Sequence, residues 1–294
     1  MHLLLVKSMF CPNENYYTIT LKSLIKINMF FSLIRHKFNK NPVNENQYQM
    51  NENIMIDIYC IGWVNIFTNH VIKFLESNLT DIDNIDTNFF DLNYGKYHTL
   101  NQMIDYVKSH TMYDFVIYMD HDVYFDVNCV NDFSNLRSLI DHKINDKNLG
   151  LIALNQKKDI RHKKDIYENE HQFMNYRIIF PSCTGSIANG CFMISPNTLI
   201  QIPHFELFSI YGLDDYYLDK QLIKMNFLNV VIENMYVIHP YDNNDKYTAW
   251  KKNKILKMIN NHNYNYNHKD HNHKNHDDYF QQIQDSSNFW SDIQ

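Results

Sequence analysis

The sequence has little glycine, little proline and no apolar segment long enough to cross a membrane. Its 294 residues include only six glycines and six prolines. A membrane-spanning helix needs about 20 consecutive apolar residues. The best candidate, Ser23–Ile34, is interrupted by Lys26 and Asn28, and the opening MHLLLVKSMF is too short for a signal peptide. We therefore predict no transmembrane segment.

An excess of basic charge is also missing. Lys and Arg number 27 against 33 Asp and Glu, which gives a formal net charge of −6. Proteins that bind nucleic acid usually carry a basic stripe. Two short basic clusters, at 157–164 and 251–257, are predicted to be solvated surface, and local attraction to phosphate is the alternative. The composition therefore predicts no nucleic-acid partner.

Paired cysteines are missing as well. The five cysteines are odd in number and no two have CxxC spacing, so the sequence shows no zinc or redox motif of that kind. Reduced thiols are typical of a cytosolic compartment. We expect a soluble, cytoplasmic protein.

Three parts are predicted along the chain. Residues 1–50 end in the polar segment NKNPVNENQYQMNEN and are predicted to be an extension and a linker. Residues 51–259 are predicted to form the folded domain. Residues 260–294 contain NNHNYNYNHKDHNHKNHDD, a His/Asn-rich stretch of low complexity that cannot build a core. We expect this tail to be disordered and both ends to be dispensable for the fold.

Strand-like and helix-like patterns alternate within the central part. The predicted strands are 54–63, 88–93, 115–119, 150–154, 190–195 and 229–233, and the predicted helices are 65–78, 99–109, 133–143 and 215–225. Such alternation predicts an α/β fold in which helices flank a mostly parallel central sheet.

Two carboxylates follow one of these strands. The apolar run Phe115–Met119 leads directly into Asp120-His121-Asp122, and ligands of open α/β sheets bind at the carboxyl ends of strands. Two neighbouring carboxylates repel each other unless a cation lies between them. Mg²⁺ and Mn²⁺ prefer oxygen ligands and commonly bridge to phosphates. The pattern favours a divalent metal site, and a polar turn at a strand end is the alternative.

A second motif lies upstream, where a loop becomes a helix. Asn93, Gly95 and Asn101 form N-x-G-x5-N. Gly95 allows a tight turn or the close approach of a ligand, and Lys96 and His98 are available to face phosphate. A helix cap with a simple turn would account for the same residues.

Further downstream lie an acidic pair and a histidine. Asp214 and Asp215 begin a predicted helix, where carboxylates interact favourably with the helix dipole. One of them could cap the helix while the other acts as a general base. His239 follows a predicted strand and could offer a neutral imidazole to a metal. A polar loop histidine is the alternative.

In their order along the chain, these segments resemble glycosyltransferases of the GT-A fold, most closely the inverting family 2 type. The resemblance covers roughly residues 53–257. The matching segments are Asn93–Asn101, Asp120–Asp122 as the DxD motif, Asn189–Ser195 under the acceptor, the acidic pair Asp214–Asp215 and His239 as a late metal ligand. The sequence departs from the family by having Asp214 where the first acid is usually Glu.

This resemblance implies a GT-A domain over residues 51–259 and a single displacement at the anomeric carbon of a nucleotide-diphospho-sugar. It favours a UDP-sugar donor and an acceptor hydroxyl on a glycan, protein or lipid. It implies Mn²⁺ or Mg²⁺ held by Asp120, Asp122 and His239, and Asp215 or Asp214 as the catalytic base. The nucleotide contacts that it implies are Asn93, Gly95, Lys96, Asn101, Asp120 and Gly190.

Two other functions fit part of the sequence. A haloacid-dehalogenase-like phosphatase also begins with a hydrophobic strand that ends in DxDx[T/V], and the residues DHDV match it. That motif normally opens its domain, whereas here two predicted strand–helix units precede it. A non-catalytic GT-A-like sugar-binding protein is the second alternative.

Overall fold

One large sheet organises the protein. The computed structural model describes residues 1–40, 54–65, 67–156, 170–180, 187, 190–206, 210, 214–240, 249–250, 253 and 281–286. Within them, eleven strands form a sheet whose main order is β3-β2-β1-β4-β10-β7-β11-β9-β8. Two short strands lie off this path, since β5 pairs with β11 and β6 pairs with β7. The strands are β1 (His2–Phe10), β2 (Met55–Trp63), β3 (Asn84–Phe90), β4 (Phe115–Met119), β5 (Tyr124–Phe125), β6 (Lys143–Ile144), β7 (Lys147–Gln156), β8 (Glu170–Phe173), β9 (Tyr176–Ile179), β10 (Cys191–Ile194) and β11 (Leu228–Ile238).

Most of the central strands run parallel, which confirms the predicted fold class. Strands β3, β2, β1 and β4 are parallel neighbours. Strand β10 is antiparallel to both β4 and β7, and β7 is again parallel to β11. The carboxyl ends of these parallel strands therefore lie at one edge of the sheet.

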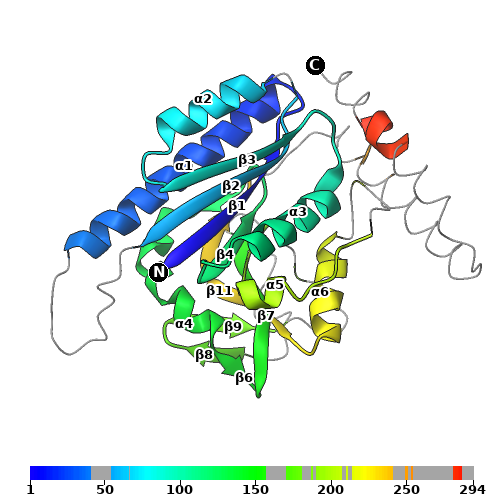
Figure 1. Ribbon diagram of the computed structural model, residues 1–294. Helices are drawn as coiled ribbons and strands as arrows, with labels where there is room; N and C mark the ends of the chain where they lie inside the picture. The colour runs from blue at the N-terminus through cyan, green and yellow to red at the C-terminus, as the bar shows by residue number, and fades with distance from the viewer. Residues whose placement is uncertain are drawn as a thin grey trace, which may run out of the picture.

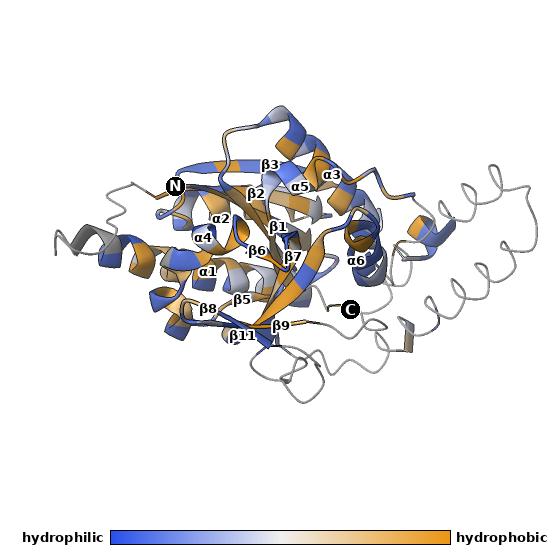
Figure 2. Ribbon diagram, turned by 90° about the horizontal axis from the view of Figure 1, so that it is seen from below, coloured by the Kyte–Doolittle hydropathy of each residue, from blue (hydrophilic) through white to orange (hydrophobic). Residues whose placement is uncertain are grey.

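Helices cover both faces of the sheet (Figure 1). The helices α1 and α2 and the segment around α4 cover one face, and α3, α5 and α6 cover the other. Figure 2 shows orange apolar strands between helices that carry both orange and blue residues, as amphipathic helices do. The helices are α1 (Glu14–Lys40), α2 (Thr68–Asn78), α3 (Gly95–Ser109), α4 (Leu136–Ile140), α5 (Pro196–Leu199) and α6 (Asp214–Lys224), with 3₁₀ turns η1 (Val127–Asn131) and η2 (Phe133–Asn135).

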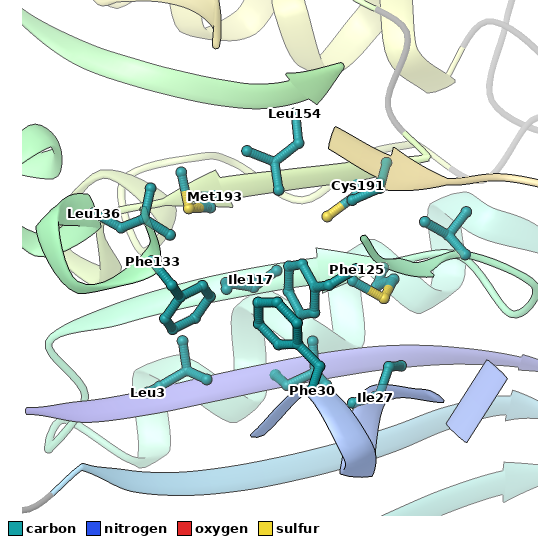
Figure 3. Packing of buried hydrophobic residues seen from close by; sticks show 14 of the residues in the cluster. Leu3, Ile27, Phe30, Ile117, Phe125, Phe133, Leu136, Leu154, Cys191 and Met193 are labelled. Atoms are coloured by element: carbon teal, nitrogen blue, oxygen red, sulfur yellow. The ribbon is translucent and has the colours of Figure 1, made fainter. Parts of the chain in front are cut away.

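Aromatic side chains fill the core beneath the sheet on the α1 face. Phe30 of α1 stacks on Phe125 with ring centroids 4.5 Å apart, and it meets Phe133 edge-on at 5.5 Å. Figure 3 shows these rings close to Leu3 of β1 and Ile117 of β4, in the same apolar cluster. Strand β4 is buried at every residue, because helices cover both of its faces.

The N-terminal segment is part of this core, so the prediction that residues 1–50 form an extension is wrong for residues 2–40. Strand β1 lies between β2 and β4 in the sheet, and all of Leu3–Val6 are 0% exposed. Helix α1 then packs its apolar side on the sheet. The apolar run of β1 is short and the polar stretch follows α1 closely, which is why composition alone misplaces this boundary. The predicted linker at 41–50 lies outside the described residues.

The C-terminal tail also contributes a described segment. Residues 281–286 are helical, and Ile283 is only 3% exposed because it packs with Ile210. Ser286 is fully buried and accepts a hydrogen bond from Asn93. The prediction of a disordered tail is therefore wrong for residues 281–286, and its remainder lies outside the described part of the chain.

Several predicted boundaries also differ from the structure. The second predicted strand, 88–93, is β3 at Asn84–Phe90. Helix α3 begins at Gly95 and not at residue 99. The helix predicted over 133–143 is reduced to η2 and the short α4. No helix among the described residues is long and apolar enough to cross a membrane. None of the described cysteines forms a disulfide bond with another.

Candidate active site

Strand pairing brings the DxD turn together with two other predicted site residues. Met119, the last residue of β4, pairs with Cys191 of β10. The next backbone amide, that of Asp120, donates to the carbonyl of Gly190 over 2.9 Å. A Cβ atom on Gly190 would lie 3.2 Å from Gln156 Nε2 and 3.4 Å from His239 Nδ1, so Gly190 lies directly beside His239.

A second pairing places His239 beside the turn. Tyr124 of β5 pairs with Ile238, the last residue of β11, so the residues just before β5 lie next to those just after β11. As a result His239 Nε2 lies 3.3 Å from Asp122 Oδ2. The structure thus brings together two residues that are 117 positions apart, by the difference of their numbers.

Asp122 is a buried carboxylate with one oxygen that has no hydrogen-bond partner among the described residues. The residue is 8% exposed, and the oxygen without a partner is the buried Oδ1. Burial would raise the pKa of Asp122, but the imidazoles of His121 and His239 and the ammonium of Lys7 outweigh burial and lower it. The carboxylate is therefore ionised, with one oxygen unsatisfied. A divalent cation that prefers oxygen ligands fits this atom.

Asp120 faces a different set of partners. Tyr118 donates its hydroxyl hydrogen to Asp120 Oδ1 over 3.0 Å, and Lys96 Nζ lies 3.4 Å from the same oxygen. Among the described residues, no three His, Cys, Asp or Glu side chains gather closely enough to hold a metal by themselves. The three predicted metal ligands therefore do not form one cluster, and only Asp122 and His239 are in contact.

Lys96 connects Asp120 to the acidic pair. Its Nζ lies 2.9 Å from Asp214 Oδ2 and 3.5 Å from Asp215 Oδ1. It also lies over the ring of Tyr118, 5.4 Å from the centroid. The sequence predicts that Lys96 faces phosphate. In the structure its ammonium, at the N-terminus of α3, lies among the carboxylate of Asp120 in the DxD turn and the two carboxylates at the N-terminus of α6. Two sites predicted separately, the DxD turn and the acidic pair, are thus joined through one cation.

The two acids of the pair differ in protonation. Burial, together with the neighbouring carboxylates of Asp214 and Asp120, raises the pKa of Asp215 to about 7 against the opposing effect of Lys96. Burial also acts on Asp214, but the charge of Lys96 and hydrogen bonds from Lys96 and Asp215 outweigh it and lower its pKa. Asp214 is therefore the ionised partner of Lys96, and Asp215 titrates in the range suited to a general base.

The N-x-G part of the upstream motif is held by contacts within the protein. Asn93 Oδ1 accepts the backbone N–H of Gly95 over 3.0 Å, and Asn93 Nδ2 donates to Ser286 Oγ over 3.0 Å. Gly95 has a φ of +79°, and a Cβ atom there would lie 2.3 Å from the carbonyl oxygen of Ile210. Glycine is required because protein backbone, not a ligand, approaches it.

Asn101 has a similar internal role. Its Nδ2 donates to the carbonyl of Phe205 over 2.9 Å, and its Oδ1 accepts the N–H of Phe205 over 2.7 Å. These contacts join α3 to the segment after α5. The predicted nucleotide contacts of Asn93, Gly95 and Asn101 stay predictions, and the structure accounts for all three residues without a ligand.

Lys7 is one residue near the site that the sequence analysis did not identify. It is 0% exposed in β1, and its Nζ donates to the carbonyl oxygens of Asp120 and Val123 and to Ser23 Oγ. A single lysine directly after the apolar run Leu3–Val6 was the available signal. Residue Asn189 of the predicted acceptor segment lies outside the described residues.

Solved structures of glycosyltransferases share this fold. The mannosyltransferase PcManGT from Pyrobaculum calidifontis, solved with GDP-Man and Mn²⁺, aligns with 84% of this chain and 59% of its own, with a TM-score of 0.53 and 12% identity. TarS from S. aureus aligns with 84% of this chain and 38% of its own, with a TM-score of 0.50 and 12% identity. The structure is thus a mixed α/β fold that matches GT-A glycosyltransferases.

This chain spans less than two thirds of the length of either of these structural neighbours. No protein-family model matches the sequence. A comparison with curated protein sequences gives no significant match. At 12% identity the likeness concerns the fold, so the activity has to be argued from the site.

Proposed function

We propose that this protein is a metal-dependent glycosyltransferase. It moves a hexosyl or N-acetylhexosaminyl group from a nucleotide-diphospho-sugar to an acceptor hydroxyl, with inversion at the anomeric carbon. UDP-sugars are the favoured donors. The observation that carries the proposal is that Lys96 joins the DxD turn to Asp215. In this turn Asp122 has a buried oxygen without a hydrogen-bond partner among the described residues, and the pKa of Asp215 is raised to about 7.

The metal-binding side of the proposal rests on Asp122 and His239, whose side chains are in contact. Divalent ions of this kind are commonly bound through one or two protein carboxylates together with phosphates of the substrate, which agrees with the small number of protein ligands here. Asp120, the first residue of the turn, is the third proposed ligand. When bound, Mn²⁺ or Mg²⁺ neutralises the charge that develops on the departing diphosphate.

The proton-transfer side rests on the acidic pair. Asp215 takes the proton of the acceptor hydroxyl, and its side chain is 35% exposed, so an acceptor can reach it. Asp214 holds Lys96 in place through their 2.9 Å contact. A base that deprotonates the acceptor in one in-line displacement inverts the anomeric centre, which is why this geometry favours inversion.

The experiment is a panel of UDP- and GDP-sugars incubated with the full chain and Mn²⁺. We expect one donor to raise the melting temperature in the presence of Mn²⁺ and to release nucleoside diphosphate slowly by hydrolysis. Proton NMR of the released sugar at early times reports its anomeric configuration. A donor that binds without turnover, also when mixed glycan acceptors are supplied, would favour the non-catalytic sugar-binding alternative.

The phosphatase alternative is tested in the same preparation. Three strands and three helices, from β1 to α3, precede the DxD strand β4, whereas the phosphatase motif normally opens its domain. Moreover, Asp120 Oδ1 is engaged by Tyr118 and Lys96. A beryllofluoride complex that stabilises the protein, and that disappears in Asp120→Asn, would favour a phosphatase over a glycosyltransferase.

A further inference from the structure

Lys7 is a charged residue in the interior of the sheet, beneath the DxD turn. It lies in β1, and none of its surface is exposed. A buried ammonium group is costly unless it is paired and hydrogen-bonded. The contacts of Lys7 therefore indicate its role in the structure.

All three hydrogens of the ammonium group have acceptors. Lys7 Nζ lies 2.5 Å from the carbonyl oxygen of Asp120, 2.8 Å from that of Val123 and 2.7 Å from Ser23 Oγ. A lysine ammonium has three donors and no acceptor, so these partners use its full capacity. Lys7 is consequently a fixed anchor and has no hydrogen left for a substrate.

The two carbonyls belong to the first and last residues of one turn. The N–H of Val123 donates to the carbonyl of Asp120 over 3.1 Å, which closes the turn. Ser23 of α1 donates to the carbonyl of Val123 over 2.7 Å. One cation and one hydroxyl, from β1 and α1, thus hold both ends of the turn that carries Asp120 and Asp122.

We propose that Lys7 is a positioning residue, which locks the Asp120–Val123 turn from beneath so that Asp122 keeps its unsatisfied oxygen directed toward the divalent metal. This inference rests on the proposed function for its metal. The locked turn is itself independent of that function. The residues that hold the turn contact its backbone, and Lys7 in addition places a positive charge near Asp122, so a variant that spares this charge is needed beside Lys7→Met.

The test compares Lys7→Met with Leu5→Ala. Methionine fills a similar volume but leaves the carbonyls of Asp120 and Val123 with one donor fewer. Leu5 lies in the same strand and is also fully buried, so its truncation destabilises the sheet without touching the turn. The first readout is hydrogen–deuterium exchange of peptides that cover residues 120–123, measured without metal or substrate.

We expect Lys7→Met to speed exchange in these peptides at least tenfold relative to Leu5→Ala. The second readout is Mn²⁺ binding, followed by the EPR signal of free Mn²⁺. Loss of a residue that orients a metal ligand typically weakens metal binding about 10–100-fold, and we expect a loss in this range for Lys7→Met and unchanged affinity for Leu5→Ala. Transfer by Lys7→Met should show a lower kcat with the KM for acceptor unchanged.

Equal exchange in the two variants would overturn the locking of the turn, and unchanged Mn²⁺ affinity in Lys7→Met would overturn its role toward the metal. If Lys7→Met fails to fold, Ser23→Ala decides, because it removes one donor to Val123 and one acceptor of Lys7 while sparing the charge. Ser23→Ala should also speed hydrogen–deuterium exchange in the peptides that cover residues 120–123, with a smaller change in Mn²⁺ affinity. Exchange at the wild-type rate in these peptides would overturn the proposal. A wild-type protein that binds no Mn²⁺ would instead contradict the proposed function, and the exchange result would still stand.

Discussion

The Asp120–Val123 turn and the Asn93–Asn101 segment both lead into the candidate site, but they use their polar atoms differently. In the turn, the backbone is held from beneath by Lys7, and Asp122 keeps an oxygen without a partner among the described residues. In the upstream segment, Asn93 and Asn101 direct their amides at other parts of the protein. Lys96, within that segment, reaches the site.

This difference separates a side chain with an atom available to a ligand from side chains whose contacts stabilise the protein. Buried polar atoms nearly always have hydrogen-bond partners, and an atom that lacks one commonly faces a ligand, a water or an ion. Asp122 Oδ1 is such an atom. The oxygen and the nitrogen of both Asn side chains have partners within the protein, so their motif shapes the start of α3 and its contacts.

The largest expected effect is that of Asp122→Ala. Removing the carboxylate should lower transfer by about 10⁴-fold, because a metal's stabilisation of developing charge is worth several kcal/mol. In Asp122→Ala, the rise in melting temperature caused by UDP should no longer depend on Mn²⁺, while the protein without ligand still unfolds cooperatively. Asp105→Ala, at an exposed position of α3, is the control. Wild-type protein that gives equal shifts in EDTA and in Mn²⁺ would contradict the metal role.

Asp215→Asn should come next, with a loss of about 10³-fold in transfer, since general-base catalysis typically contributes 10²–10⁴-fold. Nucleotide and Mn²⁺ affinities should change little, because Asn keeps the shape of the side chain. Asp214→Asn is the matched variant, and we expect it to act through a misplaced Lys96 and so to alter KM as well. If instead Asp214→Asn alone showed the pure loss of kcat, the two roles would be reversed.

A pH profile provides the third test. The pKa of Asp215 is raised to about 7 by burial and by neighbouring carboxylates, and a base must be deprotonated to act. The kcat should therefore fall about tenfold per pH unit below pH 7, and Asp215→Asn should remove this limb. The stability of the fold should depend on pH in the opposite sense. Because the pKa of Asp215 is raised in the folded state, protonated Asp215 favours folding, and this stabilisation is lost as pH rises through about 7. A flat profile in the wild-type protein between pH 5.5 and about 7.5 would be inconsistent with this assignment.

The smallest effect on activity is expected from Asn101→Ala. It should lower the free energy of unfolding by about 1–3 kcal/mol, because the N–H and C=O of Phe205 lose their partners. Nucleotide and Mn²⁺ affinities should equal those of the wild type when measured well below the melting temperature. Gln102→Ala, at the neighbouring position, is the control. A loss of nucleotide affinity without a loss of stability would instead indicate that Asn101 contacts the nucleotide.

Sequence patterns predict the parts of the fold in which burial and periodicity agree. Strand β4 occurs at the residues predicted for it, because a short apolar run with an aspartate at each end is typical of a buried strand. Strand β1 is missed, since its partners lie far along the chain and nothing local distinguishes a central strand from an apolar extension. For the same reason no pattern shows that Lys96 lies among three carboxylates, which depends on how α3 and α6 meet.

The central position of β1 has a consequence for synthesis on the ribosome. Leu3 pairs with Ile56 on one side and with Phe115 on the other. At about 5–20 residues per second of chain growth, the apolar segment of β1 waits roughly 6–20 seconds for its second partner. During this time a chaperone has the opportunity to bind it. A chain begun by internal initiation at Met50 would retain every carboxylate and histidine proposed for the site, and yet β2 and β4 would have no strand between them.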